Sequence, residues 1–167
     1  MEFFDAVKNR ISVRDYSEED VKKSHIERII DAGRLAATAR NEQPWAFVAA
    51  HDPSTLTKIA ALCPNGSFLQ NAKWLIAVFS ADTKYYIEDC SAATQNMLLA
   101  AAALGLGACW IAGDKKDYVS RVGETLGAPQ NYRLVSMLSI GRPSSAPVAK
   151  QKKGLGELVH WENWKAS

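Results

Sequence analysis

Two arginines and a serine near the start of the chain have the spacing of an anion-binding row. Arg10, Ser12 and Arg14 occupy alternate positions, and alternate side chains of an extended segment point to the same side. Two guanidinium groups and a hydroxyl on one side match the oxygen atoms of a phosphate monoester. The alternative is that both arginines pair with surface carboxylates such as Glu18 and Glu19.

A second group of cations stands near the other end of the chain. Lys150, Lys152 and Lys153 follow Gly141, after which Pro, Ser and Lys become frequent. Such a composition favours an extended arm over residues 142–167, and taken alone it indicates a solvated tail. If the arm meets the arginine row, its ammonium groups would complete a phosphate site as point charges.

Other kinds of reactive site find little support in the sequence. The three histidines lack the spacing of a metal site, and no nucleophile stands beside a general base. Gly105-x-Gly107 lacks the third glycine and the preceding strand of a dinucleotide-binding fold. Cys63, Cys90 and Cys109 lie far apart, so we expect buried thiols in a reducing compartment rather than disulfides.

Length and composition indicate one folded domain over residues 1–167. The chain is 47% hydrophobic and 23% charged, as expected for a globular protein. Its formal net charge of +2 is too small to imply a nucleic-acid surface. The first residues lack the basic flank of a secretion signal, and no apolar run approaches the roughly 18 residues that span a bilayer. We therefore expect a cytoplasmic protein.

Hydrophobic periodicity predicts an alternation of helices and strands. Ser24 and Glu27 have the spacing of a capping box, and apolar residues then recur at three- and four-residue intervals as far as Ala37. Pro44 would stop this helical run. Further helices are expected after a Ser54 cap and at residues 89–104 and 115–126, with strands at 45–50, 74–79, 108–111 and 133–140. The helix at 89–104 is apolar on nearly all sides, which predicts that it is buried.

The most specific pattern runs from Ala36 to Trp45 and reads Ala-Ala-Thr-Ala-Arg-Asn-Glu-Gln-Pro-Trp. Together with the arginine row it resembles the nitroreductase family, whose members have a basic-x-Ser-x-basic row and then Ala-Pro-Ser-x-x-Asn-x-Gln-Pro-Trp. The resemblance continues in three later segments, which are residues 104–113 with Gly-Leu-Gly-x-x-Trp, Ile140-Gly141-x-Pro143, and Lys150-x-Lys152 followed by Glu157-x-Val159-His160.

The sequence departs from the family pattern at four positions and in one length. Ala37 and Thr38 stand where proline and serine are usual, and Lys152 and Gly154 where arginine and proline are common. Threonine keeps the hydroxyl donor, and an ammonium group is a less directional phosphate ligand than a guanidinium. Little chain lies between residues 110 and 133 to cover a site, so we expect an open pocket with loose selectivity.

The resemblance implies an α+β protein, a three-layer α/β/α sandwich that interlocks as a homodimer with FMN at each subunit interface. Residues carried over as phosphate ligands are Arg10, Ser12, Lys150 and Lys152. Arg14 would lie beside the pyrimidine edge of the flavin and stabilise its reduced form. Thr38 and Asn41 would reach the flavin from the partner subunit, and the backbone of Ile111, Ala112 and Gly113 would face the ring near its reacting nitrogen. A contact from Asn65 stays open.

The function implied by the resemblance is that of an FMN-dependent NAD(P)H oxidoreductase. A hydride from NADH or NADPH would pass through FMN to a nitroaromatic, a quinone or a similar small acceptor by a ping-pong mechanism. Two alternatives share the motifs. One is a flavin-binding redox sensor or flavin store without turnover, and the other is an interaction protein that has lost the cofactor. The physiological acceptor, and a ferredoxin as donor, also stay open.

Overall fold

The computed structural model describes residues 1–146 and 148–164 and is built around a four-stranded antiparallel sheet. The strands are β1 (Trp45–Ala50), β2 (Trp74–Ala81), β3 (Gly107–Ala112) and β4 (Tyr132–Gly141), in the order β1-β2-β4-β3. β2 and β4 occupy the centre, and almost all of their side chains are buried. All four strands expected from the sequence are present, and β2 is central as its continuous apolar run predicts.

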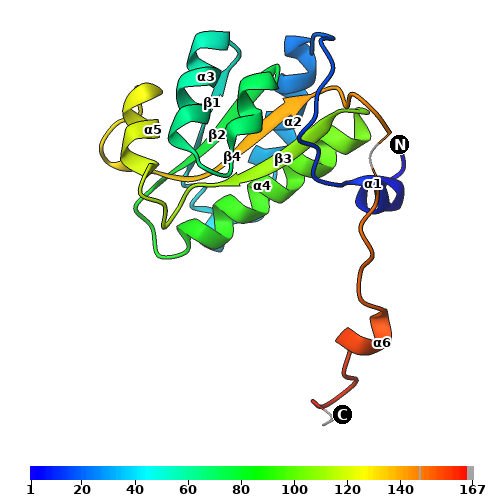
Figure 1. Cartoon of the computed structure of the whole chain (residues 1–167). Coiled ribbons are helices and arrows are strands. Elements are labelled where there is room, and N and C mark those ends of the chain that lie inside the picture. The colour runs from blue at the N-terminus through cyan, green and yellow to red at the C-terminus, as the bar shows by residue number, and fades with distance from the viewer. Residues whose placement is uncertain (147, 165–167) are drawn as a thin grey trace.

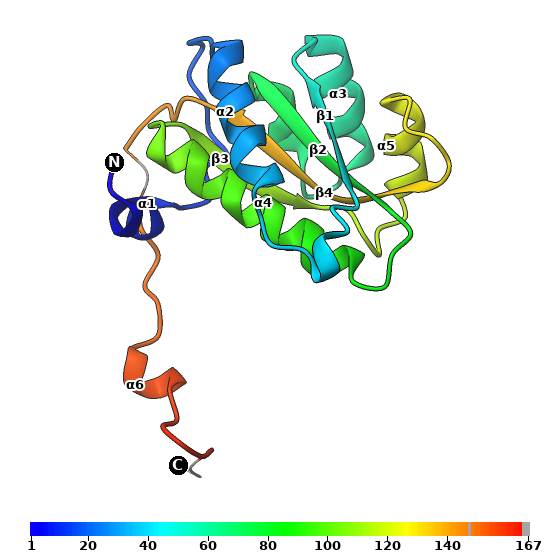
Figure 2. The same ribbon diagram turned by 180° about the vertical axis from the view of Figure 1, so that it is seen from behind.

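Helices cover both faces of this sheet (Figures 1 and 2). On one face, α2 (Lys23–Arg34) and α4 (Tyr86–Ala103) pack in a hydrophobic cluster that includes Ile29 and Met97. On the other face, α3 (Pro53–Leu62) and α5 (Val119–Thr125) pack in a second cluster. The 3-10 helix η2 (Ser67–Asn71) also contributes to this second cluster. The predicted three-layer α/β/α architecture is confirmed.

Residues 10–17 form a segment, here called the strap, that crosses the outer end of β3. Ser12 and Ala108 form a parallel bridge, and the Val13 N–H donates to the Ala108 carbonyl over 3.0 Å. The buried Tyr16 hydroxyl donates to the Val13 carbonyl and shares a hydrogen bond with the Ser139 hydroxyl, both at 2.7 Å. These bonds fix the register of the strap against the sheet.

Helix boundaries differ from the sequence prediction where caps and small residues decide them. α2 begins at Lys23, with Ser24 already inside the helix and no side-chain cap, so the capping-box prediction is wrong. It ends at Arg34, and a turn leads to the short 3-10 helix η1 (Ala39–Asn41). α3 is capped by Asp52, not Ser54, because the Asp52 carboxylate accepts from the Thr55 N–H over 2.9 Å.

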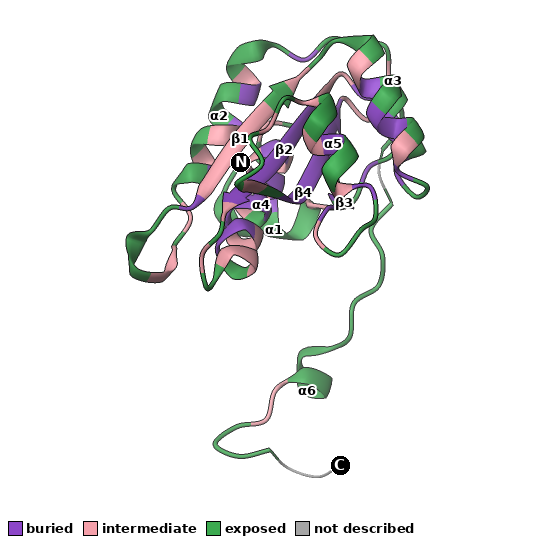
Figure 3. Cartoon of the chain, turned by 90° about the vertical axis from the view of Figure 1, so that its left-hand side faces the viewer, coloured by how far each residue is buried: buried purple, intermediate pink, exposed green. Residues whose placement is uncertain are grey.

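The two ends of the chain lie apart from the three layers. α1 (Phe3–Asn9) precedes the strap, and an extended arm follows residue 142 and carries the short helix α6 (Leu155–Leu158). The arm leads away from the sheet (Figure 1), and nearly all of its described residues are exposed (Figure 3). Four apolar side chains on it, Leu155, Leu158, Trp161 and Trp164, are 58–85% exposed.

The strap depends on a glycine in β3, which gives a testable prediction. A Cβ at Gly107 would lie 2.7 Å from Val13 Cγ1, too close for β3 and the strap to keep their present spacing. We expect Gly107→Ala to lower the free energy of unfolding by about 1–3 kcal/mol, measured by urea denaturation. Gly123→Ala is the matched control, because its Cβ would meet nothing closer than 3.9 Å. A loss no larger than that of the control would show that the close approach is dispensable.

Candidate functional site

The three residues of the predicted anion row follow one another along the strap, on the side of β3 that carries the buried Cys109 thiol. Val13 is buried while Ser12 and Arg14 are exposed, as expected if successive side chains of the strap point to opposite sides. Burial raises the pKa of the Cys109 thiol, while Arg14, a hydrogen bond with Ser12, and Arg10 act in the opposite direction. The strap therefore presents two guanidinium groups and a hydroxyl along the edge of β3 that faces away from β4.

The acids that could have neutralised this row have other partners. Glu18 pairs with Lys73 over 2.8 Å, which lowers the pKa of Glu18, and Glu19 pairs with Arg142 over 3.1 Å. Within residues 1–146 and 148–164, Arg14 forms no ion pair, and its guanidinium lies 5.5 Å from the centre of the Phe68 ring. The alternative of surface pairing with Glu18 and Glu19 is not what the structure shows.

Arg14 lines a cavity of about 420 Å³ beside β3. Four parts of the fold meet there: the strap, the end of α3 with the turn that follows it, β3, and the loop that leads into α5. The lining residues are Arg14, Leu62, Pro64, Asn65, Trp110, Ile111, Ala112, Lys116, Asp117, Tyr118 and Arg121. Ile111 and Ala112 thus lie in one cavity with Arg14, and Asn65 lines it as well.

The backbone of β3 presents N–H groups to this cavity that have no outward hydrogen bond among residues 1–146 and 148–164. The Ala108 carbonyl points outward to the strap, and the Gly113 N–H points the other way, to the Val135 carbonyl. Because these directions alternate along a strand, the N–H groups of Trp110 and Ala112 point outward, beyond the part of β3 that the strap covers. They are available to an acceptor atom in the cavity.

Tyr118 holds this edge in place from the far wall. Its hydroxyl donates to the Ala112 carbonyl, which points outward from β3 like the Ala112 N–H. The side chain is 8% exposed, and burial raises its pKa to about 12. The neighbouring Cys63 thiol is buried too, which raises its pKa to about 11.

A second set of contacts fixes the chain just after β3. The Arg133 guanidinium donates to the Tyr86 hydroxyl over 2.7 Å, and that hydroxyl donates to the Asp114 carboxylate over 3.0 Å. The N–H groups of Gly113 and Asp114 both donate to the Val135 carbonyl at 3.1 Å. The segment that carries Ile111, Ala112 and Gly113 is therefore held on both sides of the sheet edge.

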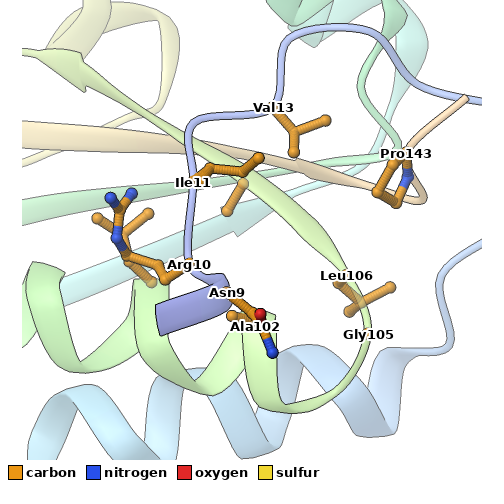
Figure 4. Close-up of a pocket in the computed structure, with 10 residues that line it drawn as sticks. Asn9, Arg10, Ile11, Val13, Ala102, Gly105, Leu106 and Pro143 are labelled. Atoms are coloured by element: carbon orange, nitrogen blue, oxygen red, sulfur yellow. The ribbon is translucent and has the colours of Figure 1, made fainter. Parts of the chain in front are cut away.

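Arg10 lies at the other end of the strap, beside a smaller cavity of about 160 Å³. Figure 4 shows Asn9, at the end of α1, and the strap residues Arg10, Ile11 and Val13 facing Gly105 and Leu106, which follow α4. Pro143, at the start of the arm, lines the same cavity. Arg10 is half-buried, and its guanidinium extends away from the Gly105–Leu106 turn in this view. The row is thus spread along the strap, with one arginine near each cavity.

Thr38 and Asn41 lie on the loop around η1 and line neither of these cavities. The loop is held by Asp89, which is buried in the first turn of α4 and accepts from the Ala39 N–H over 3.0 Å. Arg40, Asn41 and Gln43 all have positive φ angles, between 47° and 57°. Such strain in non-glycine residues persists only where the surroundings impose it.

Lys150 and Lys152 lie on the arm and are exposed. In the described part of the chain they form no ion pair, and the arm carries them away from the sheet (Figure 1). The structure of one chain therefore does not bring them to Arg10, and their predicted role requires a second subunit.

Sequence reasoning missed seven residues of the larger cavity, which are Leu62, Pro64, Trp110, Lys116, Asp117, Tyr118 and Arg121. The segment 115–126 was expected to be one helix, but α5 begins at Val119. A turn in which the Lys116 N–H donates to the Gly113 carbonyl over 3.1 Å precedes it. The one signal in the sequence was the run Lys-Lys-Asp-Tyr at 115–118, which is polar on all sides and unlike a core helix.

The described ranges hold neither a metal-ligand cluster nor a membrane-spanning helix. Residues 1–146 and 148–164 contain no group of three or more His, Cys, Asp or Glu side chains placed to bind a metal ion. In the same residues, no helix combines the length and apolar character needed to span a bilayer.

Comparison with known proteins identifies relatives over nearly the whole length of the chain. Residues 2–167 match the family model described as "Putative TM nitroreductase". A protein of Archaeoglobus fulgidus named "Putative NADH dehydrogenase/NAD(P)H nitroreductase" is 37% identical, over 93% of this chain and 94% of its own.

Solved structures have the same fold. A protein of Parabacteroides distasonis with the same name as the Archaeoglobus relative superposes with a TM-score of 0.92 and 31% identity, covering 97% of this chain and 98% of its own. A Desulfovibrio desulfuricans structure, described as a nitroreductase in complex with FMN, has a TM-score of 0.86 and 28% identity, with 99% of both chains covered.

The hydrogen bond from Tyr118 can be tested by Tyr118→Phe. Loss of the donor to the Ala112 carbonyl should lower the free energy of unfolding near pH 7.5 by about 1 kcal/mol, measured by urea denaturation. The pKa of Tyr118 is raised to about 12 from 10.0. Between pH 10 and pH 12 the unfolded chain therefore loses this proton first, and native stability falls. The Tyr118→Phe variant lacks this fall in stability. The difference in free energy of unfolding between the natural chain and the variant should therefore shrink above pH 10.

The matched control is Tyr132→Phe, since the Tyr132 hydroxyl has no hydrogen bond to a side chain or backbone group in the described ranges. A difference at Tyr118 that stays constant from pH 8 to pH 12 would contradict the assigned contact.

Proposed function

Because the chain belongs to the nitroreductase family, we propose that it is an FMN-dependent oxidoreductase that takes electrons from NADH or NADPH and passes them to a small organic acceptor. The observation that carries this proposal is the row Arg10, Ser12 and Arg14, which runs along the strap with a cavity at each end. The Desulfovibrio relative, described as an FMN complex, supports the same cofactor.

The donor groups on the strap fit an elongated phosphate ester. The four residue steps of extended chain from Arg10 to Arg14 span about 13 Å, which suits a phosphate joined to a ring system by a five-carbon chain. Arg10 and Ser12 would bind the phosphate with forked and neutral donors. The ring would then lie in the cavity of about 420 Å³ at the Arg14 end.

Bound FMN supplies reversible acceptance of a hydride at one ring nitrogen, after which negative charge develops on the pyrimidine side of the ring. The outward N–H of Ala112 is available to hydrogen-bond near that nitrogen, while the N–H groups of its neighbours Ile111 and Gly113 point toward β4. Arg14 would place its fixed charge on the pyrimidine side. Such preorganised groups stabilise the charge without rearrangement during the reaction.

A second subunit would complete the site. Thr38 and Asn41 lie away from the cavity of their own chain, and Lys150 and Lys152 lie on an arm that leaves the sheet, so we assign all four to the flavin site of a homodimer. The arm supports this assignment, because its exposed leucines and tryptophans have the composition of an interface.

The reaction would follow a ping-pong order, with nicotinamide and acceptor using the same cavity in turn. Nitroaromatic compounds and quinones are the acceptor classes that we propose, since an open site over a reduced ring admits flat molecules of many kinds. The exposed Trp110 and the small Ala112 leave room for such stacking.

The visible spectrum of the purified protein, followed by steady-state assays, tests the proposal as a whole. We expect absorption by bound flavin and repeated turnover with NADH or NADPH and a quinone or nitroaromatic acceptor. A flavin store or redox sensor would instead show one reduction of its flavin without multiple turnovers. Colourless protein that takes up no FMN would contradict the flavin function altogether.

Arg10→Ala tests the phosphate assignment. Removal of one charged pair with the phosphate should weaken FMN binding about 10- to 100-fold, measured by quenching of FMN fluorescence during titration of apoprotein. Arg28→Ala is the control, because Arg28 is an exposed arginine on α2, outside both cavities. Equal FMN affinities of the Arg10 variant and the natural chain would remove Arg10 from the site.

Arg14→Gln tests the tuning role. Loss of the cation should lower the midpoint potential of the bound flavin by on the order of 30 mV, about 1.4 kcal/mol for two electrons. The potential is measured by reductive titration against a reference dye, with Arg28→Gln as control. An unchanged potential in a variant that still binds FMN would show that Arg14 does not act on the reduced ring.

A further inference from the structure

We propose that the cavity beside β3 favours a second substrate that carries a negative charge, such as an aromatic carboxylate, and that Lys116 and Arg121 bind the charged group. This inference rests on the proposed function, because the same cavity would hold the flavin ring over which that substrate lies.

The cavity concentrates positive charge. Arg14, Lys116 and Arg121 line it against the single carboxylate of Asp117, which leaves a surplus of two positive charges. That surplus equals the formal net charge of +2 of all 167 residues. A concave surface lined mainly by positive charges focuses their electric field and raises the local concentration of anions.

These cations are not neutralised inside the protein. Within residues 1–146 and 148–164, neither Lys116 nor Arg121 forms an ion pair. Burial raises the pKa of the Cys63 thiol, and Arg121 is near enough to oppose that rise together with Tyr118. Arg121 lines the cavity together with Tyr118. Arg14 is assigned to the flavin, which leaves Lys116 and Arg121 for a second ligand.

Local stability does not account for cations at these positions. Arg121 is the third residue of α5, and a helix dipole disfavours positive charge in the first turn. Lys116 ends the turn after Gly113, and Lys115 within that turn has a φ of 64°. Left-handed conformation in a lysine costs about 1 kcal/mol or more. Strain of this kind gathers at sites where a loop must present particular groups.

The remaining walls suit a flat ring. Trp110 and Tyr118 contribute aromatic surface to the same cavity, and Trp110 is 37% exposed and so offers part of its indole to a ligand. Aromatic walls with cations at one end match a planar molecule that ends in a carboxylate.

Calorimetric titration of FMN-loaded protein with benzoate and with its neutral analogue benzamide tests this proposal. We expect benzoate to bind more tightly than benzamide. Lys116→Gln and Arg121→Gln should each weaken benzoate binding about three- to tenfold and leave benzamide binding unchanged. Lys115→Gln removes the same charge from a residue outside the cavity, and it should leave both affinities unchanged.

Three outcomes would overturn the proposal while leaving the flavin function intact. Benzoate and benzamide could bind equally, or Lys115→Gln could weaken benzoate as much as Lys116→Gln does. The third concerns the donor: the double variant of Lys116 and Arg121 could lose kcat/KM for NADPH but not for NADH, with benzoate affinity unchanged. The two cations would then bind the extra phosphate of NADPH. Protein that takes up no FMN would contradict the proposed function and this inference together.

Discussion

The hydrogen bond from the Val13 N–H to the Ala108 carbonyl sets where the strap meets the sheet, and most features of the site depend on that register. A slip of one residue would turn Ser12 and Arg14 inward and Val13 outward. Tyr16 opposes such a slip, because its buried hydroxyl is bonded to both the strap and Ser139 of β4. Two glycines, Gly107 and Gly141, leave the space that Val13 and Tyr16 fill.

The same register decides which backbone groups of β3 are free. Because the strap takes the carbonyl of Ala108, the next outward residues along the strand are Trp110 and Ala112. The Tyr118 hydroxyl donates to the Ala112 carbonyl, so the N–H of Ala112 is the group of this residue that can still bond outward. The charge of Arg14 on the strap and the N–H groups of Trp110 and Ala112 on β3 thus reach one cavity, although these residues are far apart in the sequence.

Sequence reasoning was most successful where burial on both faces of the sheet leaves a continuous apolar run, as at residues 74–79 of β2. It also placed Ser12 and Arg14 on the exposed side of an extended segment, with Val13 buried between them, because that inference needs only the period of two. It failed at the start of α2, where Ser24 has a capping pattern but the helix begins one residue earlier. Caps are decided by competition among neighbouring polar groups, which a pattern does not resolve.

Tertiary contacts explain what the sequence could not predict. Tyr118 and Arg121 reach the cavity because a turn at residues 113–116 shortens the expected helix, and nothing in the local propensities requires that turn. Thr38 and Lys152 were predicted from a family pattern rather than from a contact. Their proposed role involves a second subunit, and contacts within one chain do not test it.

The loop at residues 38–43 has a consequence for why its residues are what they are. Glycine at position 41 would relieve a conformational strain of about 1 kcal/mol, but it would also enlarge the freedom of the unfolded chain by a similar amount. The two terms nearly cancel, so thermodynamic stability is almost indifferent between asparagine and glycine at this site. What distinguishes them is the side-chain amide of Asn41, which glycine lacks and which the proposed function assigns to the flavin of a second subunit.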